Sequence, residues 1–243
     1  MASESSLTAE VVSRAESYAG TCAGIARLED VLNSPSYRDD PADFTGTFET
    51  HGTGIVSWPP EATTVLVLGL HHPEEKPRLD WWERGDTWGN RRLREISESL
   101  KQWLREEYGL CAHPLPYHLE KGGLFLKDAA ALSGIGVIGR NNLLLNPAWG
   151  PRIRLRSVLL EGDLQPTKAI AGFSPCETCE GFCQKACPVK AFPQATYSRS
   201  ICRRQMNADA EKEVPDGEIG ENGKRYPVIK YCRACELSCP VGV

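Results

Sequence analysis

Cysteine is the residue type whose spacing points most directly to chemistry in this 243-residue chain. Of its ten cysteines, Cys22 and Cys111 lie in the first 175 residues and the other eight lie in the last 68. Cysteine is about 4% of the residues, below the 8–10% typical of small disulfide-bonded scaffolds. In a reducing compartment, thiols clustered in this way indicate metal binding rather than disulfides. The lone Cys22 and Cys111 are expected to be buried, small apolar residues.

The eight clustered cysteines fall into two runs of similar design. The first is CETCEGFCQKACP, from Cys176 to Pro188, and the second is Cys202 followed at a distance by CRACELSCP, from Cys232 to Pro240. Each has a CxxC pair, another cysteine after a three-residue gap, and a proline directly after its last cysteine. Two-cluster ferredoxins carry the run C-x2-C-x2-C-x3-C-P, whose fourth cysteine binds the other cluster. The spacing therefore predicts two [4Fe–4S] clusters.

The ferredoxin pattern also predicts which thiolates share a cluster, because the last cysteine of each run crosses to the other cluster. One cluster then has Cys176, Cys179, Cys183 and Cys239, and the other has Cys202, Cys232, Cys235 and Cys187. The competing arrangement keeps each run on its own cluster. Two zinc sites are a further alternative, but zinc ligands usually come as two CxxC pairs separated by a longer spacer and need no Cys-Pro.

Charge and hydropathy narrow the possible partners. The chain has 28 Lys and Arg against 32 Asp and Glu, a net charge of −4. Nucleic-acid surfaces are usually basic, so this balance disfavours RNA or DNA as a partner. The longest aliphatic stretch, VLVLGL at 65–70, is far shorter than the about 20 residues of a membrane span. The acidic N-terminus MASESSLTAE has no signal-peptide pattern, so we expect a cytoplasmic protein.

Helical and strand patterns are mixed along the first 172 residues, which predicts an α+β fold with an α/β core. From about residue 173 the apolar runs disappear and a second, cysteine-rich domain follows, over 173–243. Residues 207–224 are acidic and polar and are expected to form a surface loop. The expected elements before residue 173 are helices near 7–20, 90–108 and 124–132, a loop over 33–60, and strands at 65–70 and 153–160.

The glycine-punctuated segment GIGVIGRNN, residues 134–142, contains a GxGxxG match. A dinucleotide-binding fingerprint needs a strand before it and a helix opening within it. Here a helix is expected before it, and Asn141, Asn142 and Pro147 follow. NAD binding is therefore not expected at this segment.

Taken together, the glycine segment and the two cysteine runs resemble the epoxyqueuosine reductase family. These are cobalamin-dependent proteins with two [4Fe–4S] clusters, related to reductive dehalogenases. The resemblance covers most of the chain, and includes CAGIARLED near residue 22, VLVLGL, LKDAAALSGIGVIGRNNLLLNP and both cysteine runs. It implies a nitroreductase-like core over 1–172 that holds a corrinoid, and a ferredoxin-like domain over 173–243 that delivers electrons to cobalt. A ferredoxin or flavodoxin is the implied electron donor.

The resemblance also implies roles for individual residues. The loop that matches GIGVIGRNN lies against the corrinoid in that family, which assigns corrinoid contacts to Gly134, Gly136, Gly139, Arg140, Asn141 and Asn142. The family has an acidic proton donor, normally Asp, a short way before this segment. The matching position here is Glu120 in YHLEKGG. A buried carboxylic acid could donate a proton from there, whereas the alternative is a solvated loop residue paired with Lys121.

The resemblance implies an oxidoreductase that passes low-potential electrons through two clusters to a bound corrinoid, to reduce the corrinoid itself or a small substrate. The family's tRNA-acting members continue past the clusters into helical repeats, whereas this sequence ends at Val243, four residues after Cys239. With the negative net charge, this makes tRNA an unlikely partner. The alternatives are a cluster-only electron carrier without a corrinoid, and a true epoxyqueuosine reductase.

Histidines and tryptophans supply further candidate contacts for a cofactor. His71 and His72 follow the strand at 65–70, at an end where sites are common. The flat side chains of Trp81, Trp82 and Trp88 could cover a corrin ring, although covering the core is the simpler expectation. His113 and His118 flank the prolines before Glu120.

Overall fold

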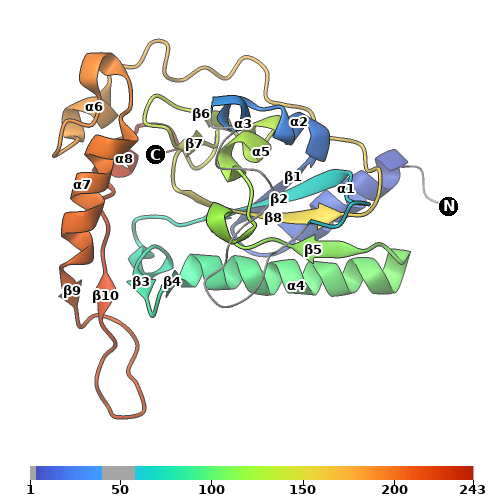
Figure 1. Cartoon of the computed structure of the whole chain (residues 1–243), viewed down its shortest axis with the longest axis horizontal. Helices are drawn as coiled ribbons and strands as arrows, with labels where there is room; N and C mark the ends of the chain where they lie inside the picture. The colour runs from blue at the N-terminus through green and yellow to red at the C-terminus, as the bar shows by residue number, and fades with distance from the viewer. Residues whose placement is uncertain (1–3, 40–57, 243) are drawn as a thin grey trace. The chain divides into compact units, whose positions relative to one another are not determined.

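The structure is a computed structural model that describes residues 4–39 and 58–242 (Figure 1). Within these ranges the side chains of residues 4, 5, 38, 39 and 120 lie outside the described part. The chain forms two compact units. Unit 1 contains residues 1–71, 92–137 and 154–172, and unit 2 contains residues 72–91, 138–153 and 173–243. The two units separate at 172/173, where the sequence predicts a boundary, but segments 72–91 and 138–153 group with the C-terminal region.

A four-stranded sheet organises unit 1. Its order is β1-β2-β8-β5, with β1 Thr21–Arg27, β2 Thr64–His71, β8 Ile153–Leu160 and β5 Ala112–Pro114. Strands β1 and β2 are antiparallel, with Thr21 opposite Leu70, and β5 is antiparallel to β8. Every residue of β2 from Thr64 to Leu70 is buried, because helices cover both faces of the sheet. The expected fully buried strand at 65–70 is thus confirmed.

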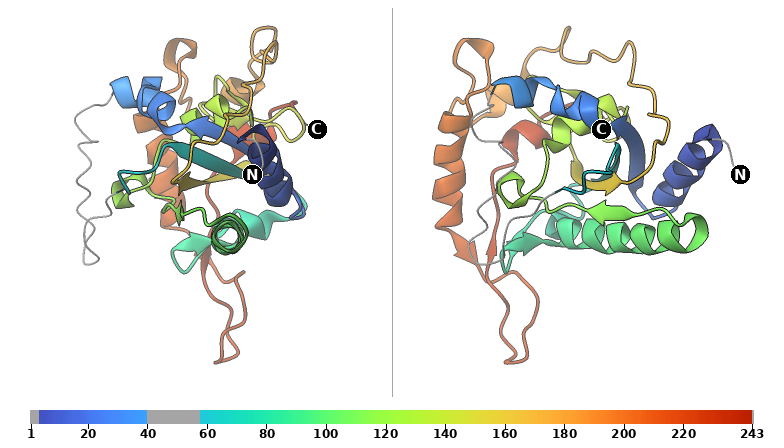
Figure 2. Two further views of the ribbon diagram at one scale, coloured as in Figure 1. Left: turned by 90° about the vertical axis from the view of Figure 1, so that its right-hand side faces the viewer. Right: turned by 45° about the vertical axis from the view of Figure 1, so that its right-hand side comes forward.

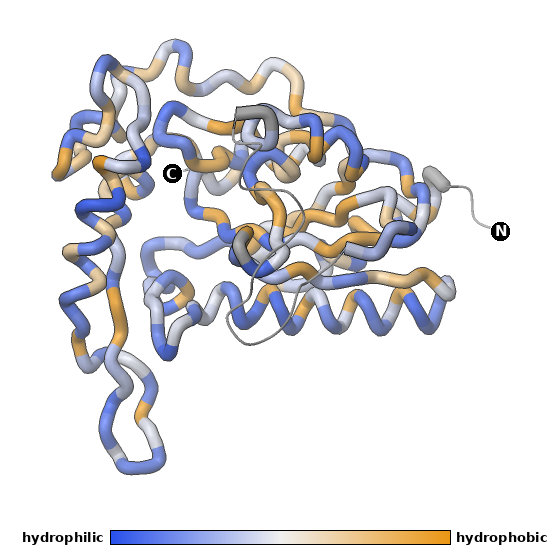
Figure 3. Tube along the Cα trace, viewed as in Figure 1, coloured by the Kyte–Doolittle hydropathy of each residue, from blue (hydrophilic) through white to orange (hydrophobic). Residues whose placement is uncertain are grey.

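Helices α1 (Glu4–Glu16) and α4 (Trp88–Tyr108) supply side chains to the main core of unit 1. On α4, Leu93, Ile96, Leu100 and Leu104 recur every three or four residues and are at most 1% exposed, as expected for one face of a helix. The hydropathy trace shows apolar and polar stretches alternating along this helix (Figure 3). Figure 2 shows α4 along its axis in its left view. Gly109 follows the helix with φ +64°. A glycine in this left-handed conformation commonly ends a helix.

Three short helices complete unit 1, and α2 and α5 contact strand β1. They are α2 (Leu28–Leu32), α3 (Pro35–Asp39) and α5 (Leu126–Leu132). Helix α3 lies where the sequence predicts only a loop, and residues 40–57 of that predicted loop lie outside the described part. Strand β1 is absent from the sequence-based expectation because CAGIA offers small residues rather than bulky β-formers. Among the described residues, no helix is long and apolar enough to cross a membrane.

Unit 2 is built from short elements. A sheet of order β4-β3-β10-β9 contains two-residue strands: Asp86–Thr87, Trp82–Glu83, Val228–Ile229 and Glu213–Val214. Strands β6 (Val137–Ile138) and β7 (Leu144–Leu145) form a separate hairpin. Helices α6 (Phe182–Ala186), α7 (Arg199–Ala210) and α8 (Ala234–Leu237) carry or flank the cysteine runs. Because α7 extends to Ala210, the expected loop at 207–224 begins later than predicted.

The buried carboxylate of Glu83 explains why segment 72–91 belongs to unit 2. Glu83 is 1% exposed, and its Oε2 accepts a hydrogen bond from the peptide N–H of Glu218 at 3.0 Å. Arg91 Nη1 lies 3.9 Å from its Oε1. Strand β3 also pairs directly with β10, far along the chain. Contacts of this kind join segments that the sequence gives no reason to connect.

Gly24 on β1 provides a test of the packing in unit 1. A methyl group at Gly24 would overlap the backbone carbonyl oxygen of Ser133, at the end of α5. Because backbone cannot move aside as a flexible side chain can, we expect Gly24→Ala to lower the free energy of unfolding by about 1–3 kcal/mol, the usual cost of overpacking. Chemical denaturation followed by far-UV circular dichroism measures this change. An unchanged unfolding midpoint would mean that the approach of α5 to β1 is not tight.

Candidate cluster-binding site

Four of the eight clustered thiols, all in unit 2, form one group. Burial raises the pKa of Cys183, and the neighbouring thiols of Cys176, Cys179 and Cys239 raise it further. Burial also raises the pKa of Cys239, where Cys176 and Cys179 contribute again. Cys239 belongs to the second run and the other three belong to the first. We call Cys176, Cys179, Cys183 and Cys239 the first quartet.

The other four thiols form a second group. Burial is the largest cause that raises the pKa of Cys232, and Asp209, Cys187 and Cys202 add to it. Burial, followed by Cys232 and Cys202, raises the pKa of Cys235 to about 12. We call Cys187, Cys202, Cys232 and Cys235 the second quartet.

The two quartets neighbour each other, because Cys183 is a further neighbour that raises the pKa of Cys235. This grouping brings together the same residues as the crossed arrangement expected from the sequence. Thiolates crowded in this way repel one another, and a metal centre removes that repulsion, so metal binding and thiol ionisation are coupled. A single zinc ion would need its ligand sulfurs about 2.3 Å from the metal. In the described ranges, no three His, Cys, Asp or Glu side chains are grouped so as to hold one metal ion.

Peptide N–H groups point at several of these sulfurs. The N–H of Ala191 donates to Cys187 Sγ at 3.2 Å. Backbone hydrogen bonds from Gln184 and Ala234 act on Cys183 and Cys232, in the direction that lowers the pKa. Because a hydrogen bond to the charged form favours that form, these donors favour thiolates. Thiolates are the form that binds iron.

A buried ionic network supports the second run between two of its cysteines. Arg233 lies between Cys232 and Cys235, and its guanidinium donates to Glu236 from Nε at 3.0 Å and also from Nη2. Its Nη2 donates to Nδ1 of His72 at 3.1 Å, and its Nε lies 3.4 Å from Oδ2 of Asp80. Burial alone would lower the pKa of Arg233, but the hydrogen bond and charge of Glu236 and the charge of Asp80 raise it. The predicted cofactor candidate His72 therefore contacts this network.

The glycine segment folds as a hairpin whose tip reaches both cysteine runs. The N–H of Arg140 donates to Cys176 Sγ at 3.4 Å, and its Nη1 donates to the Cys179 carbonyl at 3.2 Å. Asn141 is 4% exposed, and its Nδ2 donates to the Cys235 carbonyl at 3.3 Å. The side chains of Arg140 and Asn141, predicted to contact a corrinoid, thus bond to the cysteine loops.

The remaining residues of this segment determine the path of its backbone. Gly134 has φ +76°, and a methyl group there would overlap the carbonyl oxygen of Lys168. A methyl group at Gly139 would lie 2.7 Å from a carbon of Leu145. Asn142 has φ +56°, a conformation that asparagine tolerates. Gly136 connects α5 to β6. A corrinoid contact at this segment stays a prediction.

Glu120, the predicted proton donor, lies in the short helix η3 (Leu119–Lys121) of unit 1. Its side chain lies outside the described part. The turn that follows is tight, because Gly122 has φ +93° and a methyl group on Gly123 would lie 2.6 Å from the Pro116 carbonyl oxygen.

The predicted aromatic and histidine candidates have partners within the chain. Lys230 Nζ lies 4.0 Å from the ring centre of Trp81, and Arg78 and Arg91 both lie over the ring of Trp88. His113 Nε2 lies 2.6 Å from Oε1 of Glu161. Sequence reasoning missed Arg233 and Asp209, whose Oδ2 accepts the N–H of Cys232 at 2.8 Å. Arg233 could have been singled out from the sequence, because it is a charged residue between two predicted ligands, Cys232 and Cys235.

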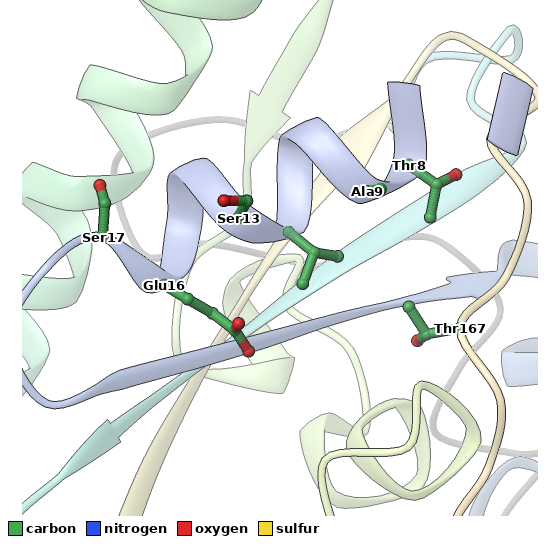
Figure 4. Close-up of a pocket in the computed structure, with 7 residues that line it drawn as sticks. Thr8, Ala9, Ser13, Glu16, Ser17 and Thr167 are labelled. Atoms are coloured by element: carbon green, nitrogen blue, oxygen red, sulfur yellow. The ribbon is translucent and has the colours of Figure 1, made fainter. Parts of the chain in front are cut away.

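A separate groove of about 640 Å³ runs beside α1 in unit 1 (Figure 4). It is lined by Thr8, Ala9, Val12, Ser13, Glu16, Ser17 and Thr167. Figure 4 shows Thr8, Ser13 and Glu16 on α1, with Thr167 on a separate segment. None of the site residues predicted from the sequence lines this groove.

The two lone cysteines differ in their surroundings. Burial, with a contribution from Glu16, raises the pKa of Cys22 to about 12, whereas Cys111 is exposed, contrary to its expected burial. Because the thiolate is the nucleophile, we expect iodoacetamide at pH 8 to label Cys111 and to leave Cys22 unlabelled in the folded protein. Labelling of Cys22 should accelerate as the pH rises toward 12. Peptide mass spectrometry after timed quenching measures both rates, and equal rates at pH 8 would contradict this prediction.

Comparisons with known proteins give this site a context. No family model matches the chain. An epoxyqueuosine reductase from Lactococcus garvieae is 26% identical over 196 residues, which cover 74% of this chain and 52% of that protein. The chain therefore spans about half the length of this curated relative.

Two solved structures share the fold. An epoxyqueuosine reductase bound to a tRNA stem loop has a TM-score of 0.67 and 17% identity, and the match covers 99% of this chain and 66% of that one. A reductive dehalogenase, described as B12-dependent, has a TM-score of 0.52 and 17% identity, and the match covers 96% and 31% of the two chains.

The tRNA stem loop in the first of these structures does not fit the expectation that tRNA is an unlikely partner. Net charge describes the whole chain and not the local surface that would bind a stem loop. The mixture of helices and strands expected from the sequence is confirmed. In sequence and in fold, the chain is similar to the epoxyqueuosine reductases, with reductive dehalogenases among its other relatives.

Proposed function

We propose that this chain is an iron–sulfur oxidoreductase that holds two [4Fe–4S] clusters, one in each quartet, and passes low-potential electrons to a corrinoid. Unit 1 corresponds in this proposal to a nitroreductase-like corrinoid domain, and unit 2 to a ferredoxin-like domain. The electrons reduce the corrinoid itself or a substrate. A small redox protein of the ferredoxin or flavodoxin type is the proposed electron donor.

One observation carries the cluster part of the proposal. Eight thiols from two distant runs collect as two neighbouring quartets, and each quartet takes one cysteine from the other run. When bound, such clusters supply one-electron transfer at potentials that depend on hydrogen bonds to sulfur and on solvent exposure. The chain contributes the thiolates, the peptide N–H donors from Ala191 and Arg140, and the partial burial of both quartets.

The corrinoid part of the proposal rests on the relatives, one of which is described as B12-dependent. The contacts of Arg140 and Asn141 do not add to it. We retain Glu120 as the proposed proton donor because its sequence position matches the family's acid.

A second candidate is an epoxyqueuosine reductase proper, which acts on tRNA. It is favoured by the curated relative in Lactococcus garvieae and by the structural relative that holds a tRNA stem loop. The two candidates share clusters and differ in substrate.

Anaerobic purification followed by iron, sulfide and cobalt analysis tests the proposal. We expect about eight irons and eight sulfides per chain, from two clusters of four, and a changed electron paramagnetic resonance spectrum of added cob(II)alamin. Protein that contains zinc and no iron would refute the cluster part. Eight irons with an unperturbed cobalamin spectrum would instead leave a cluster-only electron carrier. Conversion of an epoxyqueuosine-containing stem loop by the reduced protein would favour the second candidate.

A further inference from the structure

We infer that the tip of the β6–β7 hairpin, Arg140 and Asn141, positions the two cysteine runs so that the first quartet can form from both. This inference rests on the proposed function, because it concerns the assembly of the same clusters. It gives these two residues a role toward the iron–sulfur centres, distinct from the corrinoid contact that the family resemblance implies.

The contacts divide cleanly between the two runs. Arg140 binds the first run, through its N–H to Cys176 Sγ at 3.4 Å and its Nη1 to the Cys179 carbonyl at 3.2 Å. Asn141 binds the second run, through its Nδ2 to the Cys235 carbonyl at 3.3 Å. Adjacent residues of one turn therefore connect Cys179 and Cys235, which are more than fifty positions apart in the sequence.

The first quartet is where this connection matters. Three of its sulfurs come from the first run, and the fourth, Cys239, comes from the second. The relative placement of the two runs decides whether these four sulfurs meet around one cluster. Helices α6 and α8, which carry Cys183 and Cys235, are in contact, and the hairpin tip hydrogen-bonds to both runs.

The tip can act as a rigid support because its own conformation is fixed. The N–H of Gly139 donates to the Leu143 carbonyl at 2.9 Å, and Asn141 Oδ1 accepts the N–H of Leu143 at 3.2 Å. Asn141 as a whole is 4% exposed. A support that is already ordered does not have to be ordered when the cluster assembles, and rigid elements hold sites more accurately than mobile loops.

The N–H of Arg140 also acts on the charge of the cluster sulfur. Other peptide donors to the first quartet lie next to the ligands themselves, at Gln184 and Val241, whereas Arg140 comes from a different element. A donor near sulfur stabilises the reduced cluster, which carries more negative charge, and hydrogen bonds to the sulfurs are among the factors that set the potential. Loss of this donor should therefore make the midpoint potential more negative.

Four variants test this inference in the full-length protein. Asn141→Asp removes the donor to Cys235 and keeps an acceptor for the N–H of Leu143, while Asn141→Ala removes both. Arg140→Pro removes the N–H to Cys176 together with the guanidinium, and Arg140→Ala removes the guanidinium alone. Asn207→Ala and Arg105→Ala, at exposed helical positions, are the matched controls.

We expect both Asn141 variants to lose iron to a chelator at least several-fold faster than the wild type, while the controls match the wild type. In Arg140→Pro we expect one cluster to have a more negative midpoint potential than the same cluster has in Arg140→Ala. Anaerobic redox titration followed by electron paramagnetic resonance measures both potentials. If the wild type holds about eight irons and all four variants match it in iron loss and potential, the inference is wrong and the proposed function stands. If the wild type holds no iron, the proposed function itself fails. An Asn141→Asp apoprotein that has lost its far-UV signal would also overturn the inference, because it would show a general role in folding.

Discussion

Replacing Cys183 and Cys239 together by alanine is expected to remove one cluster and to leave the other in place. Both thiols belong to the first quartet, so the second substitution removes a ligand from a cluster that the first has already destroyed. The double variant should retain about four of the eight irons, as should each single variant. Cys187→Ala with Cys235→Ala, both in the second quartet, should likewise retain about four.

The mixed pair gives the opposite result if the crossed arrangement holds. Cys183→Ala with Cys187→Ala removes one ligand from each quartet and should abolish both clusters, because these two cysteines share a run but not a quartet. If each run instead held its own cluster, Cys183 and Cys239 would be ligands of different clusters, and their double variant would lose all iron. Anaerobic iron and sulfide analysis distinguishes these outcomes. Cys111→Ala, at an exposed cysteine of unit 1, is the control that should retain all eight irons.

The crossed ligand set stays a prediction, and it follows from a local pattern. CxxC pairs, a three-residue gap and a terminal Cys-Pro recur in both runs, and such spacing constrains how a short loop can wrap a cluster. The structure brings the same residues together, and the iron analysis above tests whether they bind iron.

The secondary structure could be predicted where one face of an element carries bulky apolar residues. Helix α4, with Leu93 to Leu104 on one stripe, and the aliphatic strand β2 are of this kind. Strand β1 is built from small residues and α7 from polar ones, so hydrophobic periodicity gives no signal for either. Tertiary packing, such as the approach of α5 to Gly24, specifies β1 instead.

The surroundings of the quartets could not be predicted, because they depend on long-range contacts. Nothing in the sequence indicates that Asn141 would bind the Cys235 carbonyl or that Glu83 would bind the N–H of Glu218. The same holds for Arg233, which meets His72 and Asp80 from a distant segment. These polar contacts determine which segments join unit 2, and this is why 72–91 and 138–153 leave the contiguous first domain expected from the sequence.

Arg233→Met is expected to destabilise unit 2 strongly. The side chains of Arg233, Asp80 and Glu236 are each only 11–12% exposed. Removing the guanidinium leaves two carboxylates buried near each other without their cation. Breaking a buried ion pair from one side costs about 3–5 kcal/mol, mainly because the remaining charge stays desolvated. Anaerobic denaturant titration of the cluster-loaded protein, followed by far-UV circular dichroism, measures the loss.

Lys230→Met is the matched control, because Lys230 pairs with Asp216 at 40% and 47% exposure. An exposed pair of this kind contributes about 0–1 kcal/mol, and the contact of Lys230 with Trp81 adds about 0.5–1 kcal/mol at an exposed site. The double variant Arg233→Met with Glu236→Gln should recover part of the stability lost in Arg233→Met, because it removes one of the two stranded charges. Equal losses for Arg233→Met and Lys230→Met would contradict the prediction, since it attributes the larger loss to the deeper burial of the Arg233 network. Failure of Glu236→Gln to recover stability would instead show that the loss came from the packing of the Arg233 side chain and not from its charge.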